Sequence, residues 1–490
     1  MAVIVPSTTV TTGTLIGNAD VADNDLVWIE ESVSLVSTDW RAIEVSEQFL
    51  RVNVDGTVIG ENRAIDLDSA STDLDYGYDI TIGETGSVVA NNDFAFYVGS
   101  NSLNNVSLGS ISVDNAGSIT SYDRGAVLMF RANTATLSNS GTITSHDAGA
   151  TFSSAVMFYA IGNAYFDNSG LIQRTKIGGG ELYGATVSFL AGTENVVASN
   201  SGTILSYDQA FNSDALVSET FTNTGEIYGR VELSDTVGGT FKNFGFVDGN
   251  VNTAGGADLV TNGGTISGTL DLGAGDDTYT ASNTGLVTGG VLGGTGNDTL
   301  TGGSDADFLD GGADNDRLFG RGGDDDLRGG LGSDFMSGGM GDDQLIGDDG
   351  ADKMFGGDGD DTLNGGRDQD TIRGGDGNDE INGGRLADVL RGGAGADTFL
   401  YTVKQDSSTG ASDTIQDFEV GIDVIDLSAV ASGLTFVGTA AFSGTGNEVR
   451  YDIDGSGKTF IQVDTDGNGS ADMRIWLTDV GALSVDDFVL

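Results

Sequence analysis

Aspartate recurs at every ninth residue over a long stretch of this chain. Twelve consecutive nine-residue units run from Gly293 to Leu400, and the first unit reads GGTGNDTLT. Every unit has Gly at its first place and an apolar residue at its eighth. The sixth-place residues are Asp298, Asp307, Asp316, Asp325, Asp334, Asp343, Asp352, Asp361, Asp370, Asp379, Asp388 and Asp397. Because calcium takes about six to eight oxygen ligands from carboxylates and main-chain carbonyls, this spacing predicts a ladder of calcium sites.

Glycine supplies the backbone that such a ladder requires. Gly at places one, two and usually four can take positive φ, and it has no Cβ to keep carbonyl oxygens from converging on an ion. Places seven to nine predict a short strand whose middle side chain points inward, with two units, or eighteen residues, in each turn. Charged residues replace the second or fourth glycine at Asp305, Asp314, Arg321, Asp348 and Asp368. The unit 383–391 has Leu386 at place four, so we expect its calcium loop to be the least regular.

The charge of the chain predicts that this segment folds only with counterions. The chain has 74 acidic and 21 basic side chains, for a formal net charge of −53, and residues 293–400 carry 25 acidic against 8 basic, or −17. Stacked carboxylates repel one another, so we expect disorder when calcium is scarce. Six turns offer sites for about ten ions, which would roughly cancel the local charge.

Other bulk features limit the functional classes. The chain has no cysteine and a single proline, so disulfides and thiolate metal sites are excluded. The N-terminal MAVIVPSTTV lacks the basic and long apolar regions of a secretory signal peptide, and the longest apolar run, 155–161, is too short to span a membrane. Strong acidity argues against nucleic acid as a partner.

A looser repeat precedes the nonapeptides. An apolar residue, Asn, a small residue, Gly, any residue and Ile or Val recur, as in LSNSGTI at 137–143, with weaker copies at 54–58 and 84–88. The Asn positions are Asn115, Asn139, Asn168, Asn200, Asn223, Asn243, Asn262 and Asn283. Their intervals of 19 to 32 residues suit one rung of a β-solenoid each. Stacked rungs place like residues together, so we expect a hydrogen-bonded column of Asn side chains.

These patterns predict an all-β chain in three segments. A parallel β-helix, or β-solenoid, over residues 1–255 passes into a calcium-binding parallel β-roll over 256–400, with a junction at 281–292. A small C-terminal β-domain follows over 401–490. An earlier calcium-type unit, LGAGDDTYT, places Asp277 at its sixth position.

The nonapeptides, together with SDTIQDFEVGIDVIDLSAV (412–430) and the closing DDFVL, resemble the RTX proteins, the haemolysin-type calcium-binding repeat family. These segments also closely resemble the C-terminal domain of the serralysin-type secreted metalloproteases, and the resemblance covers roughly residues 272–490. It implies several bound calcium ions and a C-terminal signal read by the type I secretion machinery of a bacterium. The protein would then be secreted or attached to the cell surface. Asp464 and Asp466, with Asn468 and Asp472, have calcium-loop spacing, although a surface turn fits that pattern equally well.

The metalloprotease activity is not implied, because zinc binding there needs His-Glu-x-x-His and this chain has one histidine, His146. TSHDAG around His146 reads as a solvated polar turn. No Gly-x-Ser-x-Gly is present, so we expect no enzyme but a structural or adhesive protein that meets a polysaccharide, a cell surface or copies of itself. The alternative is a β-helix polysaccharide lyase or epimerase. Its candidate residues are Tyr122, Asp123, Arg124, Arg131, Asp147, Arg174 and Lys176.

Overall fold

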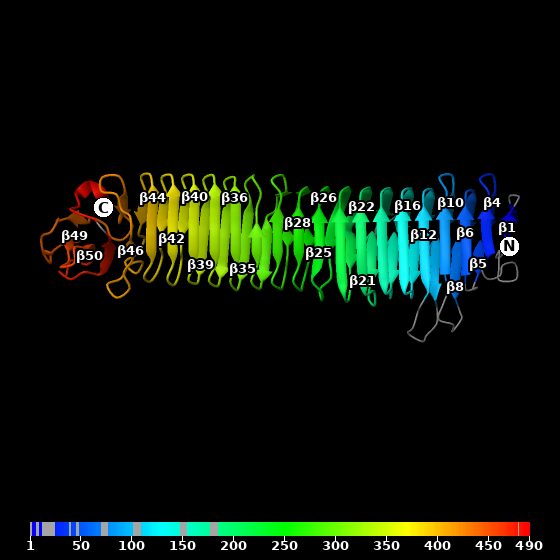
Figure 1. The fold of residues 1–490 in the computed structure, drawn as a ribbon, viewed down its shortest axis with the longest axis horizontal. Coiled ribbons are helices and arrows are strands. Elements are labelled where there is room, and N and C mark those ends of the chain that lie inside the picture. The colour runs from blue at the N-terminus through cyan, green and yellow to red at the C-terminus, as the bar shows by residue number, and fades with distance from the viewer. Residues whose placement is uncertain are drawn as a thin grey trace. The chain divides into compact units, whose positions relative to one another are not determined.

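The computed structural model describes residues 2–5, 9–11, 25–38, 41–45, 49–69, 77–100, 109–147, 154–176, 185–478 and 480–490 (Figure 1). Positions 1 and 6–8 of the N-terminal decapeptide therefore lie outside the described residues. The described residues contain strands and a single 3-10 turn, η1 (Val485–Asp487), so the predicted all-β class is confirmed. No helix in these ranges is long and apolar enough to cross a membrane.

The chain divides into two compact units, Met1–Asp271 and Leu272–Leu490. The sequence predicts three segments, so this division into two units differs from it. That the three segments are separate folding units stays a prediction. Within each unit, strands lie side by side in successive turns (Figure 1).

Unit 1–271 is a parallel β-helix whose rungs pair in register. One column of strands includes β9 (Gly77–Ile82), which ends at Ile82. The strands that follow it in this column each end at one of the Asn residues: β12 (Ser110–Asn115), β15 (Thr134–Asn139), β18 (Asn163–Asn168), β21 (Asn195–Asn200), β23 (Ser218–Asn223), β25 (Gly239–Asn243) and β28 (Leu259–Asn262). The column that follows the Asn turn contains β7 (Thr57–Gly60), β10 (Ser87–Ala90), β13 (Ser118–Ser121), β16 (Thr142–Asp147), β19 (Leu171–Lys176), β22 (Thr203–Ser213), β24 (Glu226–Glu232), β26 (Phe246–Asp248) and β29 (Thr265–Ile266). A third column holds β8 (Ile65–Ser69), β11 (Phe96–Ser100), β14 (Val127–Phe130), β17 (Val156–Tyr159) and β20 (Val187–Leu190), and it continues through the end of β22.

The Asn column forms the predicted ladder. Each Asn Nδ2 donates to the Oδ1 of the Asn on the next rung at 2.7 to 2.9 Å, from Asn115 through to Asn262. Upstream, Ile82 pairs with Asn115 and Val54 with Ile82, so the weaker copies continue the column with apolar residues. Asn283 is an exception, because it is exposed in a turn of the other unit.

Aromatic rings fill the interior of unit 1–271 beside this ladder. Phe158 stacks on Phe189 with centroids 4.6 Å apart, and Phe211 stacks on Phe221 at 4.1 Å. Phe241 continues the stack at 5.6 Å from Phe221. All five rings are fully buried, so apolar residues that recur once per rung become one continuous core.

Unit 272–490 is built from the nonapeptides in two facing sheets. One sheet contains β31 (Thr278–Ala281), β34 (Thr299–Thr301), β36 (Arg317–Gly322), β38 (Phe335–Met340), β40 (Lys353–Asp358), β42 (Thr371–Asp376), β44 (Val389–Ala394) and β46 (Thr414–Ile415). The other contains β33 (Val291–Thr295), β35 (Phe308–Ala313), β37 (Asp326–Leu331), β39 (Gln344–Asp349), β41 (Thr362–Asn364), β43 (Glu380–Asn382), β45 (Thr398–Leu400) and β47 (Val424–Asp426).

The register of these sheets confirms an eighteen-residue turn. Leu318 pairs with Met336, and Leu309 pairs with Leu327, each partner lying eighteen residues further along the chain. All twelve eighth-place residues are buried, with at most 1% of their surface exposed. The strands are longer than predicted: β36, for example, runs from place seven of one unit to place three of the next. The glycines at places one and two therefore extend the strands as well as forming the turns.

The end of the chain packs onto this array as a small β-domain. Strands β49 (Glu448–Ile453), β50 (Thr459–Asp464) and β51 (Met473–Leu477) form an antiparallel meander. β51 also pairs in parallel with β46, and β52 (Phe488–Val489) pairs in parallel with β47. Each nonapeptide sheet thus gains one further strand from the C-terminal region.

Candidate metal centre

The predicted Asp residues lie in two lines, one along each edge of the nonapeptide array. In each line, Oδ1 of one Asp accepts a hydrogen bond from the backbone N–H of the Asp one turn earlier, at 2.7 to 3.0 Å. The first line contains Asp277, Asp298, Asp316, Asp334, Asp352, Asp370 and Asp388. The second contains Asp307, Asp325, Asp343, Asp361, Asp379 and Asp397. We call these lines the Asp ladders.

The second carboxylate oxygen of most ladder residues is buried without a hydrogen-bond partner. This holds for Oδ2 of all the sixth-place residues from Asp298 to Asp397 except Asp307. These eleven side chains are at most 3% exposed. A buried carboxylate oxygen with no donor is costly, because burial removes its water and nothing replaces it. A column of such atoms therefore indicates a ligand that supplies positive charge.

First-place glycines leave the space in front of these oxygens. A Cβ built on Gly320 would lie 2.1 Å from Asp325 Oδ2 and 2.7 Å from the carbonyl oxygen of Gly338, one turn further on. The same pair of oxygens converges at Gly356, which faces Asp361 Oδ2 at 2.1 Å and the Gly374 carbonyl at 2.7 Å. Any side chain at these places would fill the cradle. Carboxylate and carbonyl oxygens are the donor set that calcium prefers, so these residues fit the predicted ion.

Burial also changes the acidity of the ladder carboxylates. It raises the pKa of Asp370 to about 8, and the charges of Asp388 and Asp352 add to the rise. The pKa of Asp343 rises to about 6, again mainly through burial. Each backbone N–H that donates to Oδ1 opposes the rise without cancelling it. Protons therefore compete with a cation for these carboxylates at a higher pH than they would at exposed aspartates.

Two units depart from the pattern, 302–310 at its Asp and 383–391 at Leu386. In 302–310, Asp307 Oδ2 accepts from the N–H of Gly303 at 2.6 Å, whereas the other sixth-place Oδ2 atoms have no such donor. Leu386 instead takes φ of +82°, the left-handed conformation that glycine takes at this place in other units. The backbone of 383–391 therefore keeps the pattern at the cost of local strain, and a less regular calcium loop in this unit stays a prediction.

Two ladder residues were missed in the sequence. Asp413 Oδ1 accepts from the N–H of Asp388 at 3.0 Å, and Asp423 Oδ1 accepts from that of Asp397 at 3.0 Å. They extend the two ladders beyond the last nonapeptide. The signal was an Asp-x-Ile triplet, at 413–415 and 423–425, with the same sixth-to-eighth pattern but off the nine-residue spacing.

The C-terminal acidic loop forms a compact cluster. Ligand oxygens of Asp464, Asp466 and Asp472 all lie within 4.8 Å of one another. Asp464 is fully buried, and its two oxygens accept from the N–H groups of Gly467 at 2.8 Å and Gly469 at 2.7 Å. Because these donors already satisfy Asp464, the loop is explained as a turn, and calcium binding at Asp464 and Asp466 stays a prediction.

His146 is not in a solvated turn, contrary to the sequence interpretation. It lies in β16, half-buried, with its ring stacked on Tyr122 at a centroid distance of 4.8 Å and Nδ1 hydrogen-bonded to Thr175. Burial lowers the pKa of its imidazole. Pairing of β13, β16 and β19 stacks these three residues, which explains the contact.

The residues considered for glycan chemistry are spread over separate turns. Arg174 is buried, with 2% of its surface exposed, whereas Arg124 lies 3.7 Å from Asp93. Arg131 follows β14 with φ of +51°, and its N–H donates to the carbonyl of Tyr159. The absence of an enzymatic activity stays a prediction.

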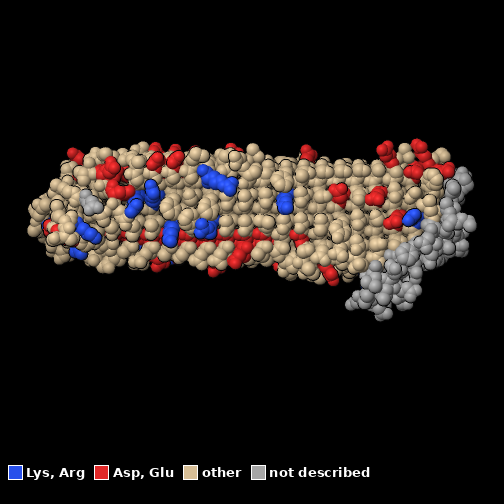
Figure 2. Space-filling model, in the orientation of Figure 1, with Lys and Arg blue, Asp and Glu red and all other residues tan. Residues whose placement is uncertain are grey.

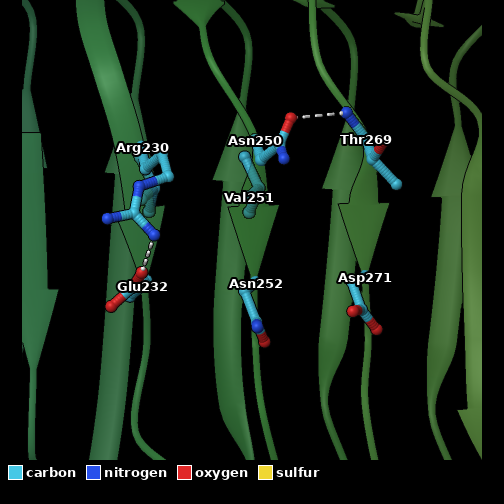
Figure 3. A pocket seen from close by; sticks show the side chains of 8 residues that line it. Arg230, Glu232, Asn250, Val251, Asn252, Thr269 and Asp271 are labelled. Carbon is cyan, nitrogen blue, oxygen red and sulfur yellow. Dashed lines mark hydrogen bonds and ion pairs between the residues drawn. The ribbon is translucent and has the colours of Figure 1, made fainter. Parts of the chain in front are cut away.

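A polar groove on unit 1–271 lies across β24, β27 (Val251–Asn252) and β30 (Leu270–Asp271) (Figure 3). Arg230 donates to Glu232 at 2.8 Å, and Asn250 accepts from the N–H of Thr269 at 3.1 Å. Arg230 also pairs with Asp208 at 3.1 Å, so its charge is compensated. The groove consequently offers amides, a hydroxyl and carboxylates, groups that hydrogen-bond well to other hydroxyls.

Comparison with known proteins places this geometry in a family. The family described as "Peptidase M10 serralysin C terminal" matches residues 139–490. The chain belongs to this family, which confirms the resemblance found in the C-terminal half. The match begins upstream of residue 272, within the β-helix.

Individual relatives match a shorter stretch. Serralysin A of Dickeya chrysanthemi is 37% identical over 95 residues, which is 19% of this chain and 20% of that protein. Metallopeptidase AprA of Pseudomonas marginalis is 40% identical over 94 residues, 19% of each chain. The chain thus spans about a fifth of the length of these curated relatives. The solution structure of the AlgE6R3 subunit from the Azotobacter vinelandii mannuronan C5-epimerase is 26% identical, covering 36% of this chain and 78% of its own, with a TM-score of 0.23. That score is too low to support an argument about function.

Proposed function

We propose that this chain is a calcium-binding RTX protein whose unit 272–490 folds when calcium binds the Asp ladders. The observation that carries the proposal is the column of eleven buried Oδ2 atoms that have no hydrogen-bond partner. Membership of the serralysin C-terminal family supports it. When bound, calcium would supply the positive charge that these carboxylate oxygens otherwise have no partner for. The chain supplies stacked carboxylates, glycine carbonyls and the space between them.

Folding and binding are linked in this proposal. Residues 293–400 carry a net charge of −17, and a thin core of one apolar residue per strand stabilises them weakly. The unfolded chain has no formed sites, so the binding free energy becomes folding free energy. A site held at 100 times its dissociation constant adds about 2.7 kcal/mol.

A calcium titration of the full-length protein tests the proposal. We expect little β-structure from residues 272–490 in chelator and a rise in β-structure, by circular dichroism, in millimolar calcium. Asp343→Asn removes one ladder charge at constant shape and should weaken binding. Asp358→Asn, at an exposed position of the same array, removes the same charge and should leave the titration unchanged. A dichroism signal that ignores calcium would contradict the proposal.

The same proposal extends to the cellular role. The protein is a bacterial, secreted or surface-attached molecule exported by type I machinery, and it folds once it meets extracellular calcium. Its β-helix serves a structural or adhesive role towards a polysaccharide, a cell surface or copies of itself, and the polar groove at Arg230 supports contact with hydroxyl-rich partners. Deleting about the last fifty residues should retain the protein in the cell. Normal export of that truncation would contradict the secretion assignment.

A polysaccharide lyase or epimerase is the second candidate, favoured by the stacked Tyr122 and His146 beside Thr175. Screening the calcium-loaded protein on glycans for turnover decides between the two. Under the structural proposal no glycan is turned over. Under the enzymatic one, Arg131→Ala or Lys176→Ala abolishes turnover while the dichroism spectrum stays unchanged.

A further inference from the structure

On one outer face of the nonapeptide array, places seven and nine carry cations and no acids, while the exposed Asp358 and Asp376 lie at the ends of two of the same strands. On β34, β36, β38, β40, β42 and β44, the residues at places seven and nine flank the buried eighth place and therefore point outward. These residues are Thr299, Thr301, Arg317, Phe319, Phe335, Ser337, Lys353, Phe355, Thr371, Arg373, Val389 and Arg391. Four are basic and none is Asp or Glu, although the whole array has a net charge of −17. We call this face the cationic strip.

Within the described residues, none of the four cations of the strip forms an ion pair. The opposite face differs, because Arg328 lies 3.3 Å from Asp326 there. Of the four, Arg391 donates to the neutral Gln416 at 2.7 Å. Asp417 follows Gln416 in the chain; burial raises its pKa, and the charges of Arg391 and Arg373 oppose that rise, so these two arginines are partly compensated by Asp417. The remaining cations are exposed and available to an external anion.

The strip is long and narrow. Parallel pairing places Arg317 beside Phe335, Phe335 beside Lys353, and Arg373 beside Arg391. Four strand spacings separate β36 from β44, so the cations extend over about 19 Å. Its width is two residue columns. Figure 2 shows Lys and Arg side chains gathered along one face of this part of the molecule, beside a line of acidic side chains.

Aromatic rings lie between the cations. Phe335 stands 5.5 Å from both Phe319 and Phe355, centroid to centroid, and the three rings are half-exposed. The Arg317 guanidinium lies 4.8 Å above the Phe335 ring, which holds it over the sheet. Flat rings and fixed cations side by side suit a ligand that has apolar faces and negative groups in the same chain.

The geometry points to a linear acidic polysaccharide as the partner of the cationic strip. A sugar ring presents an apolar face to the phenylalanines, and its carboxylate or sulfate groups reach the cations. An anionic membrane or a DNA duplex is wider than two residue columns and would meet the acids beside the strip, which repel it. The net charge of −53 does not prevent contact, since screening acts over about 8 Å at physiological salt.

Binding of dextran sulfate to the full-length, calcium-loaded protein tests this inference, with uncharged dextran as the matched probe. We expect dextran sulfate to bind with an affinity that falls as salt rises, and dextran to bind far more weakly. Arg317→Gln with Lys353→Gln should weaken binding about tenfold, because two charge-assisted contacts are lost. Arg328→Gln with Arg367→Gln changes the net charge equally, away from the strip, and should leave the affinity unchanged.

Three outcomes would overturn the inference. The first is no binding of dextran sulfate by the wild-type protein. The second is an equal loss of affinity in the two double variants, which would show an effect of net charge alone. The third is stronger binding to phosphatidylserine vesicles, lost in the strip variant, which would assign the strip to membranes. The inference rests on the folded array proposed above, so circular dichroism of each variant in calcium separates its failure from a failure to fold.

Discussion

Replacing one first-place glycine by alanine should weaken calcium binding, and the loss of affinity can be estimated from a single close contact. In Gly338→Ala the new Cβ would lie 2.1 Å from Asp343 Oδ2, whereas ordinary contacts begin at 3.4 Å, so the carboxylate must move by about 1.3 Å. Gly338 has no positive φ, so the effect is steric and does not come from backbone strain. Overpacking of this kind costs about 1–3 kcal/mol, which corresponds to roughly 5- to 150-fold in affinity.

The assay is a calcium titration of the full-length protein by circular dichroism, with calorimetry to count the ions. We expect Gly338→Ala to raise the calcium midpoint and to lose ions at neighbouring turns. Gly410→Ala is the control, because a Cβ there meets nothing within 4 Å.

A double-mutant cycle locates the effect of Gly338→Ala. In the background of Asp343→Gly the three nearest atoms, Oδ2, Cγ and Cβ of Asp343, are all absent, so adding Gly338→Ala should cost almost nothing further. Full additivity of the two substitutions, or an unchanged midpoint for Gly338→Ala alone, would refute the idea that this glycine leaves space for the carboxylate and its ion.

Three further outcomes are expected. The raised pKa of Asp370, to about 8, and of Asp343, to about 6, means that protonation favours the folded calcium-free array fully below about pH 4, and that this contribution is lost as the pH rises through about 6 to 8. In chelator, circular dichroism should therefore show more β-structure at about pH 4 than at neutral pH, where we expect the array to be largely disordered, and β-structure that increases as the pH rises would contradict this. Asn168→Ala breaks two buried hydrogen bonds of 2.7 Å and should lower the free energy of unfolding by about 1–3 kcal/mol per orphaned group, as measured by calorimetry. Asn163→Ala, at a more exposed position, is the control, and an equal loss of stability in both variants would contradict the prediction. Asp423→Ala removes the acceptor for Asp397 N–H, so limited proteolysis should open the last turns first, and uniform protection would speak against a capping role.

The period of the chain was predictable because the chemistry repeats without interruption. Twelve Asp residues in register sufficed to predict both ladders and the eighteen-residue turn, since each sixth place must meet the one a turn away. The Asn column was predictable for the same reason over most of its length. The prediction was wrong for Asn283, because the motif is present but the chain there forms an exposed turn.

Features that depend on contacts between turns were not predictable from the sequence. Asp413 and Asp423 cap the ladders at spacings of 25 and 26 residues, which the nine-residue pattern does not contain. His146 appeared solvated because its neighbours are polar, yet Tyr122 covers it from the preceding rung. The cationic strip is likewise hidden, because its residues are eighteen apart and alternate units contribute to opposite faces.

The nonapeptides have two periods at once. The same glycines and carboxylate recur every nine residues, because each edge of the array repeats the other. On each outer face, equivalent positions recur only every eighteen residues. Removing a single unit from the middle, such as 338–346, would leave every ladder carboxylate in line but rotate everything after it by half a turn. Arg317 would then lie on the opposite face from Lys353, Arg373 and Arg391. Such an array would keep its Asp ladders if it gained or lost a single unit, but each outer face would keep its residues only if units changed in pairs.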